Sequence, residues 1–396
     1  MSKARKTRNT LENTGNGHAH AVTREGLSSM AQPGREAVPG SAVLSEVASS
    51  QSKKPEAIRR APGRKGGKRE ELMVPRAEFQ SYYGKPILNE PTWQAPDIAG
   101  YLFLGGLAGA GGTIAAAAQA SGRPGLAHVM KTGAAAAAGL SLVALVHDLG
   151  RPARFLNMLR MFKPTSPMSV GSWILAGFAP LSGAAAASAV TGKLRPIGAA
   201  ATYGAGALGP ALATYTAALI SNTAVPAWHE GHREMPFVFA SSATAAACGL
   251  GLLAAPADEV EPVRRLGAIA GMAEVGAAKF MEERMGLAAE CYHEGAAGRL
   301  MKAAEVLTTA GAVGAAAGRR SALLRRAAGA ALLTGSALTR FGIFKAGVAS
   351  ARDPKYTVVP QRERLEQEKA GSEAQAAPQP KAETGAETNA KAKATQ

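Results

Sequence analysis

The stretch that decides the fold runs from Ile98 to Ala118, IAGYLFLGGLAGAGGTIAAAA, and it contains no charged residue. A helix of about 20 apolar residues is long enough to cross the hydrocarbon core of a bilayer. The alternative, a soluble Ala-rich bundle, needs a polar stripe that recurs on every helical turn, and this stretch has none. Gly and Ala let neighbouring membrane helices approach closely. The stretch therefore predicts a transmembrane helix.

Seven further apolar stretches of similar length follow, separated by short segments with Pro, Gly and charges. They predict an all-α integral membrane bundle of about eight transmembrane helices. The expected spans are 98–119, 126–147, 168–190, 198–220, 237–255, 265–284, 298–317 and 322–349. The predicted domains are a disordered basic tail at 1–85, the transmembrane domain at 86–350 and a polar, mostly disordered C-terminal tail at 351–396.

Composition narrows the possible functions. The net charge is +16, and much of it lies in residues 1–85, which are too polar to fold alone. A basic tail can indicate nucleic-acid binding, but no base-reading motif accompanies it, so we expect membrane lipid and no nucleic acid as a partner. Cys248 and Cys291 are too few for a disulfide framework, a four-thiolate zinc site or an iron–sulfur cluster. No histidine pair lies at one depth of two spans, so no haem and no metal are expected.

The orientation follows from the basic residues that flank the bundle. An even number of spans puts both tails on one side, and the loop charges alone divide equally between the two sides. Arg76 and Lys85 precede the first span, and Arg352 and Lys355 follow the last. The positive-inside rule then predicts a multi-pass protein of the cytoplasmic (inner) membrane with both termini cytoplasmic. Trp93 and Trp228 are expected in the aromatic belt of the membrane.

The loop after the second span concentrates polar groups. It begins His147-Asp148-Leu149-Gly150-Arg151 and continues with three more basic residues up to position 163. An acid and a histidine at a helix end, next to basic residues, form a charged collar at the membrane surface. The residues alone leave two interpretations open: plain anchoring, with Asp148 capping the helix or pairing with Arg151, and proton chemistry at the bilayer edge.

The run HDLGRPARFLNMLRMFKPTSPMSVGSWIL at 147–175 resembles the loop and third helix of the NrfD/polysulfide-reductase membrane-subunit family. The resemblance continues in YTAALISNTAVPAW at 215–228, AEVGAAKFMEERMG at 273–286 and RFGIFKAGVASARDPKYTVVPQR at 340–362. It covers about residues 90–362. Members of this family are eight-helix, quinone-reacting anchors of molybdenum and iron–sulfur oxidoreductases.

The resemblance implies a function that the chain performs only within a complex. Such a subunit passes electrons between the quinone pool, menaquinone or ubiquinone, and a four-cluster ferredoxin-like iron–sulfur subunit. That partner connects to a molybdopterin catalytic subunit, here formate-dehydrogenase-like or polysulfide-reductase-like, in a respiratory chain. The anchor itself holds no metal.

The resemblance also implies a quinone-binding site. The acid of the pocket falls on Asp148 and the tyrosine on Tyr215, with His147 as a candidate proton group and Arg151 beside it. Trp93 precedes the first helix, in a stretch that lacks the histidine found there in some relatives. Quinone reactions move protons as well as electrons, and carboxyl, imidazole and phenol groups suit that chemistry. Tyr215 lies about 8 Å deep at ~1.5 Å per residue, so it can share one membrane face with Asp148.

Charged residues also stand inside the last three predicted spans. They include Glu274, Lys279, Glu305 and Arg340. Intramembrane charges are expensive and mark either a proton path or a network of buried ion pairs, and both interpretations stay open. Taken alone, these charges would support an alternative function, a secondary transporter or proton-conducting protein. A transporter is expected to show an internal repeat with broken helices, and none is visible in the sequence.

Overall fold

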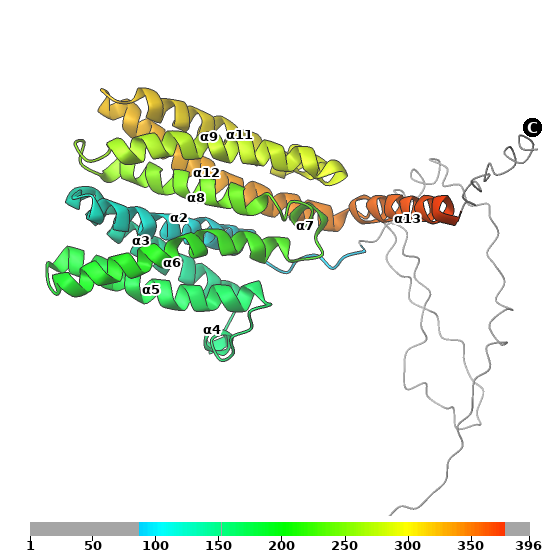
Figure 1. Cartoon of the computed structure of the whole chain (residues 1–396), viewed down its shortest axis with the longest axis horizontal. Helices are drawn as coiled ribbons and strands as arrows, with labels where there is room; N and C mark the ends of the chain where they lie inside the picture. Colours follow the sequence, from blue (N-terminus) through cyan, green and yellow to red (C-terminus); the bar gives the residue numbers. More distant parts are fainter. Residues whose placement is uncertain (1–86, 152, 377–396) are drawn as a thin grey trace, which may run out of the picture. The chain divides into compact units, whose positions relative to one another are not determined.

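The computed structural model describes residues 87–151 and 153–376 (Figure 1). These ranges are helical and contain no strand, which confirms the all-α prediction. The predicted disordered tail at 1–85 lies outside the described residues, as does 377–396. Eight long helices form a bundle: α2 Ala95–Ala120, α3 Pro124–Asp148, α5 Pro167–Thr191, α6 Arg195–Ser221, α8 Met235–Ala254, α9 Glu261–Arg284, α11 Gly295–Ala317 and α12 Ala322–Arg352.

These eight helices coincide with the eight predicted spans to within a few residues. Among the described helices, five combine the length and apolarity of a membrane span, namely α2, α3, α5, α8 and α12. The other three long bundle helices, α6, α9 and α11, do not meet that composition. The chain is therefore a multi-pass helical membrane protein, with eight as the approximate number of crossings.

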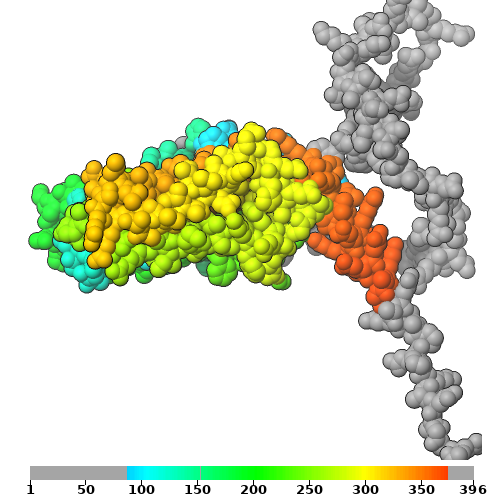
Figure 2. Space-filling view, turned by 90° about the horizontal axis from the view of Figure 1, so that it is seen from above, coloured from blue at the N-terminus to red at the C-terminus, as the bar shows by residue number. Residues whose placement is uncertain are grey.

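The bundle consists of two groups of four helices. Helices α2, α3, α5 and α6 pack together, and α8, α9, α11 and α12 form the second group. Helix α2 contacts both α8 and α12, and α6 also contacts α8; these contacts join the two groups. Figure 1 shows α9 and α11 at one edge and α5 at the other, and Figure 2 shows α9 and α11 covering the face seen from above.

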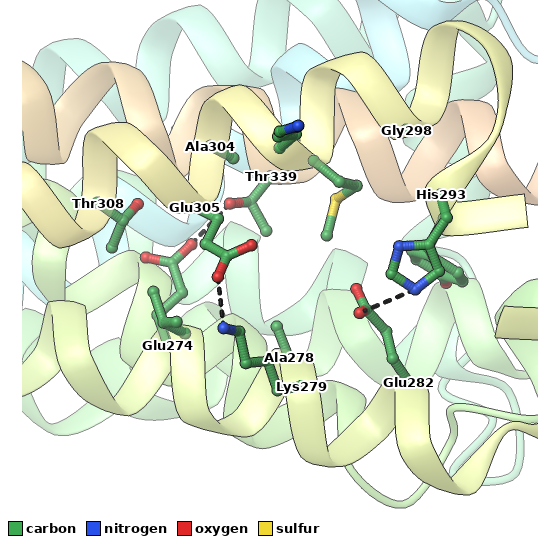
Figure 3. Close-up of a pocket in the computed structure, with 14 residues that line it drawn as sticks. Glu274, Ala278, Lys279, Glu282, His293, Gly298, Ala304, Glu305, Thr308 and Thr339 are labelled. Atoms are coloured by element: carbon green, nitrogen blue, oxygen red, sulfur yellow. Dashed lines mark hydrogen bonds and ion pairs between the residues drawn. The ribbon is translucent and has the colours of Figure 1, made fainter. Parts of the chain in front are cut away.

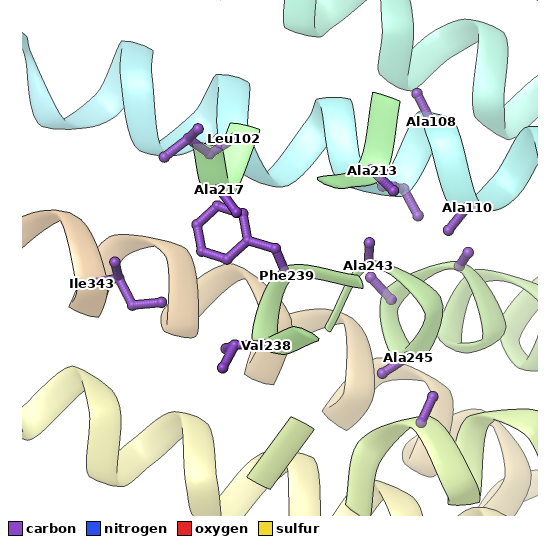
Figure 4. Packing of buried hydrophobic residues seen from close by; sticks show 14 of the residues in the cluster. Leu102, Ala108, Ala110, Ala213, Ala217, Val238, Phe239, Ala243, Ala245 and Ile343 are labelled. Carbon is purple, nitrogen blue, oxygen red and sulfur yellow. The ribbon is translucent and has the colours of Figure 1, made fainter. Parts of the chain in front are cut away.

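Small residues allow the helices to approach closely. A Cβ on Gly249 of α8 would lie 2.6 Å from the carbonyl oxygen of Gly329 of α12, and the reverse substitution meets the same obstacle. Between the two groups, alanines of α2, α6 and α8 surround a few larger side chains such as Phe239 and Ile343 (Figure 4). Helices that cross at glycine, with no room for a larger side chain, are typical of membrane bundles.

Proline and glycine set the helix ends. Proline occupies the first turn of α2, α3, α5, α6, α8 and α9, where its missing N–H costs nothing. Consecutive helices then alternate in direction. One end of the bundle, called here the Asp148 end, gathers the starts of α2, α5, α8 and α11 and the ends of α3, α6, α9 and α12.

The C-terminal segment differs from its prediction. Helix α12 continues to Arg352, and a further helix, α13, spans Lys355–Ala376, where the sequence predicted mostly disorder from 351 on. Ion pairs hold α13 to the Asp148 end: Lys355 lies 2.6 Å from Glu290, and Arg364 lies 3.0 Å from Glu230. The charged residues that made this segment look disordered in the sequence, Lys355 and Arg364, therefore form the ion pairs that hold it.

Candidate functional site

Helix α3 ends in the charged sequence His147-Asp148. Gly150 has a φ of 68°, and its N–H donates to the carbonyl of His147 at 3.0 Å. Glycine adopts this left-handed conformation without the steric cost that a Cβ brings, so the chain can turn sharply after the helix. It continues through α4, Ala153–Met158, to α5. The turn leaves His147 and Asp148 in the last turn of α3.

These two residues face the beginning of α2. The backbone N–H of Gln94 lies 3.5 Å from Asp148 Oδ1, a long hydrogen bond, and Asp97 Oδ2 lies 2.8 Å from His147 Nδ1. The His147 side chain is 71% exposed, whereas that of Asp97 is 15% exposed. Two carboxyl groups and an imidazole therefore meet where α2 begins and α3 ends, with the imidazole exposed at the surface of the bundle. We call Asp97, His147 and Asp148 the acid–imidazole cluster.

Asp97 is a member of this cluster that the sequence analysis did not select. It stands in the first turn of α2, one residue after a proline. An acid at that position is common because it interacts favourably with the helix dipole, so it carries no functional signal in isolation. The signal that could have identified it is the antiparallel hairpin of the first two spans, which brings the start of one helix to the end of the next.

Tyr215 lies on α6, six residues before the helix ends at Ser221. Its ring covers Gly171 of α5 so closely that a Cβ at that position would collide with it. The hydroxyl is buried and has no hydrogen-bond partner among the described residues. Nor does a hydrogen bond join Tyr215 to Asp148 within that part of the chain. The two residues approach the same end of the bundle from different helices without direct contact.

The tryptophans correct one prediction. Trp228 was expected in the aromatic belt, but it is fully buried, and its indole N–H donates to the carbonyl of Ile343 at 2.8 Å. It packs onto Gly347, where only a residue without a side chain fits. Trp93 stacks on it with ring centroids 5.9 Å apart and lines a cavity of about 650 Å³. Trp228 is thus a core residue that anchors the segment before α2.

Arg151 is exposed beside the end of α3. Among the described ion pairs, none joins Arg151 to Asp148. The loop that follows also exposes large apolar side chains, Leu156, Met161 and Phe162. Basic and apolar groups side by side suit the interface between headgroups and acyl chains, as plain anchoring requires.

A second group of charged side chains lies in the other half of the bundle. A cavity of about 380 Å³ separates α9, α11 and α12 and contains Glu274, Lys279 and Glu305 in its lining (Figure 3). Lys279 Nζ and Glu305 Oε1 form an ion pair at 2.5 Å. Glu274 is buried and accepts a hydrogen bond from the Thr339 hydroxyl at 2.7 Å. The predicted intramembrane charges are therefore close together, but only one pair of them forms a direct ion pair.

Arg340 occupies the centre of the bundle. Its side chain is almost fully buried, donates to the carbonyl of Phe239 at 2.9 Å and lies 3.7 Å above the Phe239 ring. Its Nε and Nη1 atoms have no partner among the described residues. Glu274 contributes the favourable opposite charge nearby. The Arg340 guanidinium is thus held by a cation–π contact and one hydrogen bond to a carbonyl, and its hydrogen bonding is incomplete within the described residues.

Ionisable groups outside the spans are also paired at the Asp148 end. The hydrogen bond from Lys355 holds the pKa of the Glu290 carboxyl below its ordinary value of 4.5. Burial raises the pKa of the neighbouring Cys291 thiol, so this thiol is unreactive at neutral pH. These contacts position α13 and supply no further catalytic group.

Comparison with known proteins identifies one family match. A family model described as "Polysulphide reductase, NrfD" matches residues 88–271. No curated protein matches the chain. The matched range includes the acid–imidazole cluster, Arg151, Trp93 and Tyr215. The charged residues around the second cavity, from Glu274 on, follow it in the sequence.

Proposed function

The chain belongs, over residues 88–271, to the polysulphide reductase, NrfD family, and from this premise we propose that it binds a quinone or quinol at its Asp148 end. Membership identifies a membrane anchor subunit of an oxidoreductase complex. The proposal adds that this anchor reacts with the quinone pool. The observation that supports it most directly is the acid–imidazole cluster, which joins the first two helices at the membrane surface.

The residues present suit a quinone chemically. A bound quinone accepts two electrons and two protons, and a quinol gives them up. The Tyr215 hydroxyl is buried and unpartnered, so it can donate a hydrogen bond to a carbonyl oxygen without breaking one. Asp148 can give or take a proton at the other end of the ring. His147, which contacts Asp97 and is exposed, can exchange that proton with the aqueous phase.

Electrons come from or go to a partner. We propose a four-cluster ferredoxin-like iron–sulfur subunit that docks on the Asp148 end and connects to a molybdopterin catalytic subunit. The NrfD family associates generally with such subunits, which supports the proposal. On the same basis we place the protein in the cytoplasmic membrane, with both termini cytoplasmic and menaquinone or ubiquinone as the electron carrier. The alternative, a secondary transporter or proton-conducting membrane protein, receives no support from the family match.

The test uses the assembled complex and compares two activities. Asp148→Asn keeps the shape of the side chain and removes its acid–base function. We expect quinone-coupled turnover to fall roughly 100-fold or more, as general acid–base groups typically contribute ~10²–10⁴-fold. Activity with a soluble dye should stay unchanged, because that route bypasses the membrane subunit.

Two variants serve as controls. Asp258→Asn changes the same side chain in the loop at the opposite end of the bundle and should leave both activities intact. Arg151→Lys should be milder than Asp148→Asn if Arg151 only anchors the loop. Normal quinone turnover in a fully assembled Asp148→Asn complex would refute the assignment and leave the collar as an anchor.

A further inference from the structure

The lining of the cavity between α9, α11 and α12 extends from His293, just before α11, to Glu274 and Thr308 inside the bundle. His293, whose side chain is 65% exposed, stands at its mouth, 3.4 Å from Glu282. The ion pair of Lys279 and Glu305 lies between His293 and Glu274 along the cavity, and its side chains are 59% and 45% exposed (Figure 3). Glu274 lies ten residues before the end of α9, about 15 Å along the helix at ~1.5 Å per residue. That depth is near the middle of a hydrocarbon core of about 30 Å.

The deep end of the cavity contains polar atoms without partners. One oxygen of Glu274, Oε2, accepts no hydrogen bond within the described part of the chain, and the Thr308 hydroxyl is equally unpartnered. Both side chains are at least 98% buried and both line the cavity. A buried carboxyl oxygen without a partner is expensive. A polar cavity of this size satisfies such groups by holding water.

We propose that this cavity is a water-filled half-channel through which Glu274 exchanges a proton with the aqueous phase at the Asp148 end. In this step a proton passes from water to the carboxylate, giving a carboxylic acid, and returns by the same route. No electron is transferred. The proposal goes beyond the quinone site and does not depend on it.

The half-channel ends near Glu274, because the lining of the described cavity includes no residue of α2 or α8. Arg340 fills the space on that side, held against Phe239. Its charge is fixed, so it stabilises the carboxylate without competing for the proton. Arg340 on α12 is the charged neighbour of Glu274. The ionisable groups that line the same cavity are Lys279 and Glu282 on α9, Lys302 and Glu305 on α11, and Tyr292 and His293 before α11.

Cysteine accessibility tests whether water reaches the deep end. In the complex with Cys248 and Cys291 changed to Ala, Thr308→Cys should react with a membrane-impermeant cationic thiosulfonate added at the Asp148 end. The thiolate forms a mixed disulfide and a sulfinate leaves. Thr216→Cys is the matched control, because Thr216 is also buried with an unpartnered hydroxyl but lines none of the described cavities.

We expect Thr308→Cys to react roughly tenfold or more faster than Thr216→Cys, because only a hydrated thiol forms the reactive thiolate. Although Thr216 lies nearer to its helix end, it should stay unmodified. Equal rates at the two positions, or reaction of Thr308→Cys only from the opposite side, would overturn the half-channel.

Infrared spectroscopy tests the proton at Glu274. During a pH titration of the complex, a carboxylic acid band should appear that shifts in heavy water and is lost in Glu274→Gln. Ala304→Leu keeps the carboxyl but fills the cavity, so it should slow the hydrogen–deuterium exchange of that band. A titration that is the same in wild type and Glu274→Gln would refute the proposal. If the Glu274→Gln complex does not assemble, the Ala304→Leu complex provides the test. A hydrogen–deuterium exchange rate of the carboxylic acid band that is the same in Ala304→Leu and wild type would also refute the proposal.

Discussion

Tyr215→Phe is expected to separate stability from activity. The substitution removes one oxygen atom and leaves the ring that packs against Gly171 in place. In the structure the hydroxyl is buried and unpartnered, so no hydrogen bond is lost from the protein itself. A quinone carbonyl that accepts a bond from this hydroxyl loses that bond in the variant. Removing the hydroxyl should therefore stabilise the folded subunit and weaken its interaction with the quinone.

The magnitudes follow from the cost of burying a hydroxyl. An unsatisfied buried polar group costs about 1–3 kcal/mol, so the variant should unfold at the same temperature as wild type or above it. Losing one hydrogen bond to the quinone in a low-dielectric pocket should cost on the order of 1–3 kcal/mol as well, or roughly 5- to 150-fold in quinone-coupled turnover.

The assay measures quinone-coupled and dye-coupled rates and the thermal unfolding of each assembled variant. Tyr292→Phe is the matched control, because the Tyr292 hydroxyl is also buried but donates to the carbonyl of Ala227 at 2.8 Å. It should destabilise the subunit by about 1 kcal/mol and leave the ratio of the two rates unchanged. A Tyr215→Phe complex that is destabilised and keeps its quinone rate would refute the role given to this hydroxyl.

Further predictions concern packing, pH and topology. Gly249→Leu should prevent α8 and α12 from approaching and abolish assembly, as measured by recovery of the folded subunit in detergent, whereas Gly249→Ala should be milder. The lowered pKa of Glu290 means that its pair with Lys355 stabilises the fold above pH 4.5 and is lost as the pH falls through the lowered value; Lys355→Gln should remove that part of the pH dependence of unfolding. Reporter fusions after Gln396 and within the 256–264 loop should report opposite sides of the membrane, and an external Gln396 fusion would contradict the orientation.

Much of the fold could be predicted because its main signal is local. Apolar length predicted the position of every long bundle helix, and prolines in the first turn of most of them set their starts. The extension of α12 and the helix α13 were missed, because their stability depends on ion pairs with distant residues. Lys355 and Arg364 look like tail residues in the sequence, and only the fold brings Glu290 and Glu230 to them.

The candidate site was predictable in its residue types and less so in its contacts. The charged run at the end of α3 drew attention to His147 and Asp148, and helix rise placed Tyr215 at the same end. Asp97 was missed because an acid in the first turn of a helix has an ordinary explanation in the helix dipole. Trp228 was misplaced because tryptophan is common both at interfaces and in cores, and its environment depends on Gly347, which is 119 positions away in the sequence.

The two proposed proton sites differ in depth, and their surroundings differ accordingly. Asp148 terminates a helix at the membrane surface, with the exposed imidazole of His147 next to it, so proton exchange there requires no channel. Glu274 lies near the middle of the bundle, where exchange with water is possible only through a hydrated cavity, and a cavity with unpartnered oxygens is found there. The surface site lies within the matched family range and the deep site follows it. In the proposed scheme, quinone chemistry at Asp148 needs no proton from Glu274, and the deep carboxyl serves a separate proton exchange.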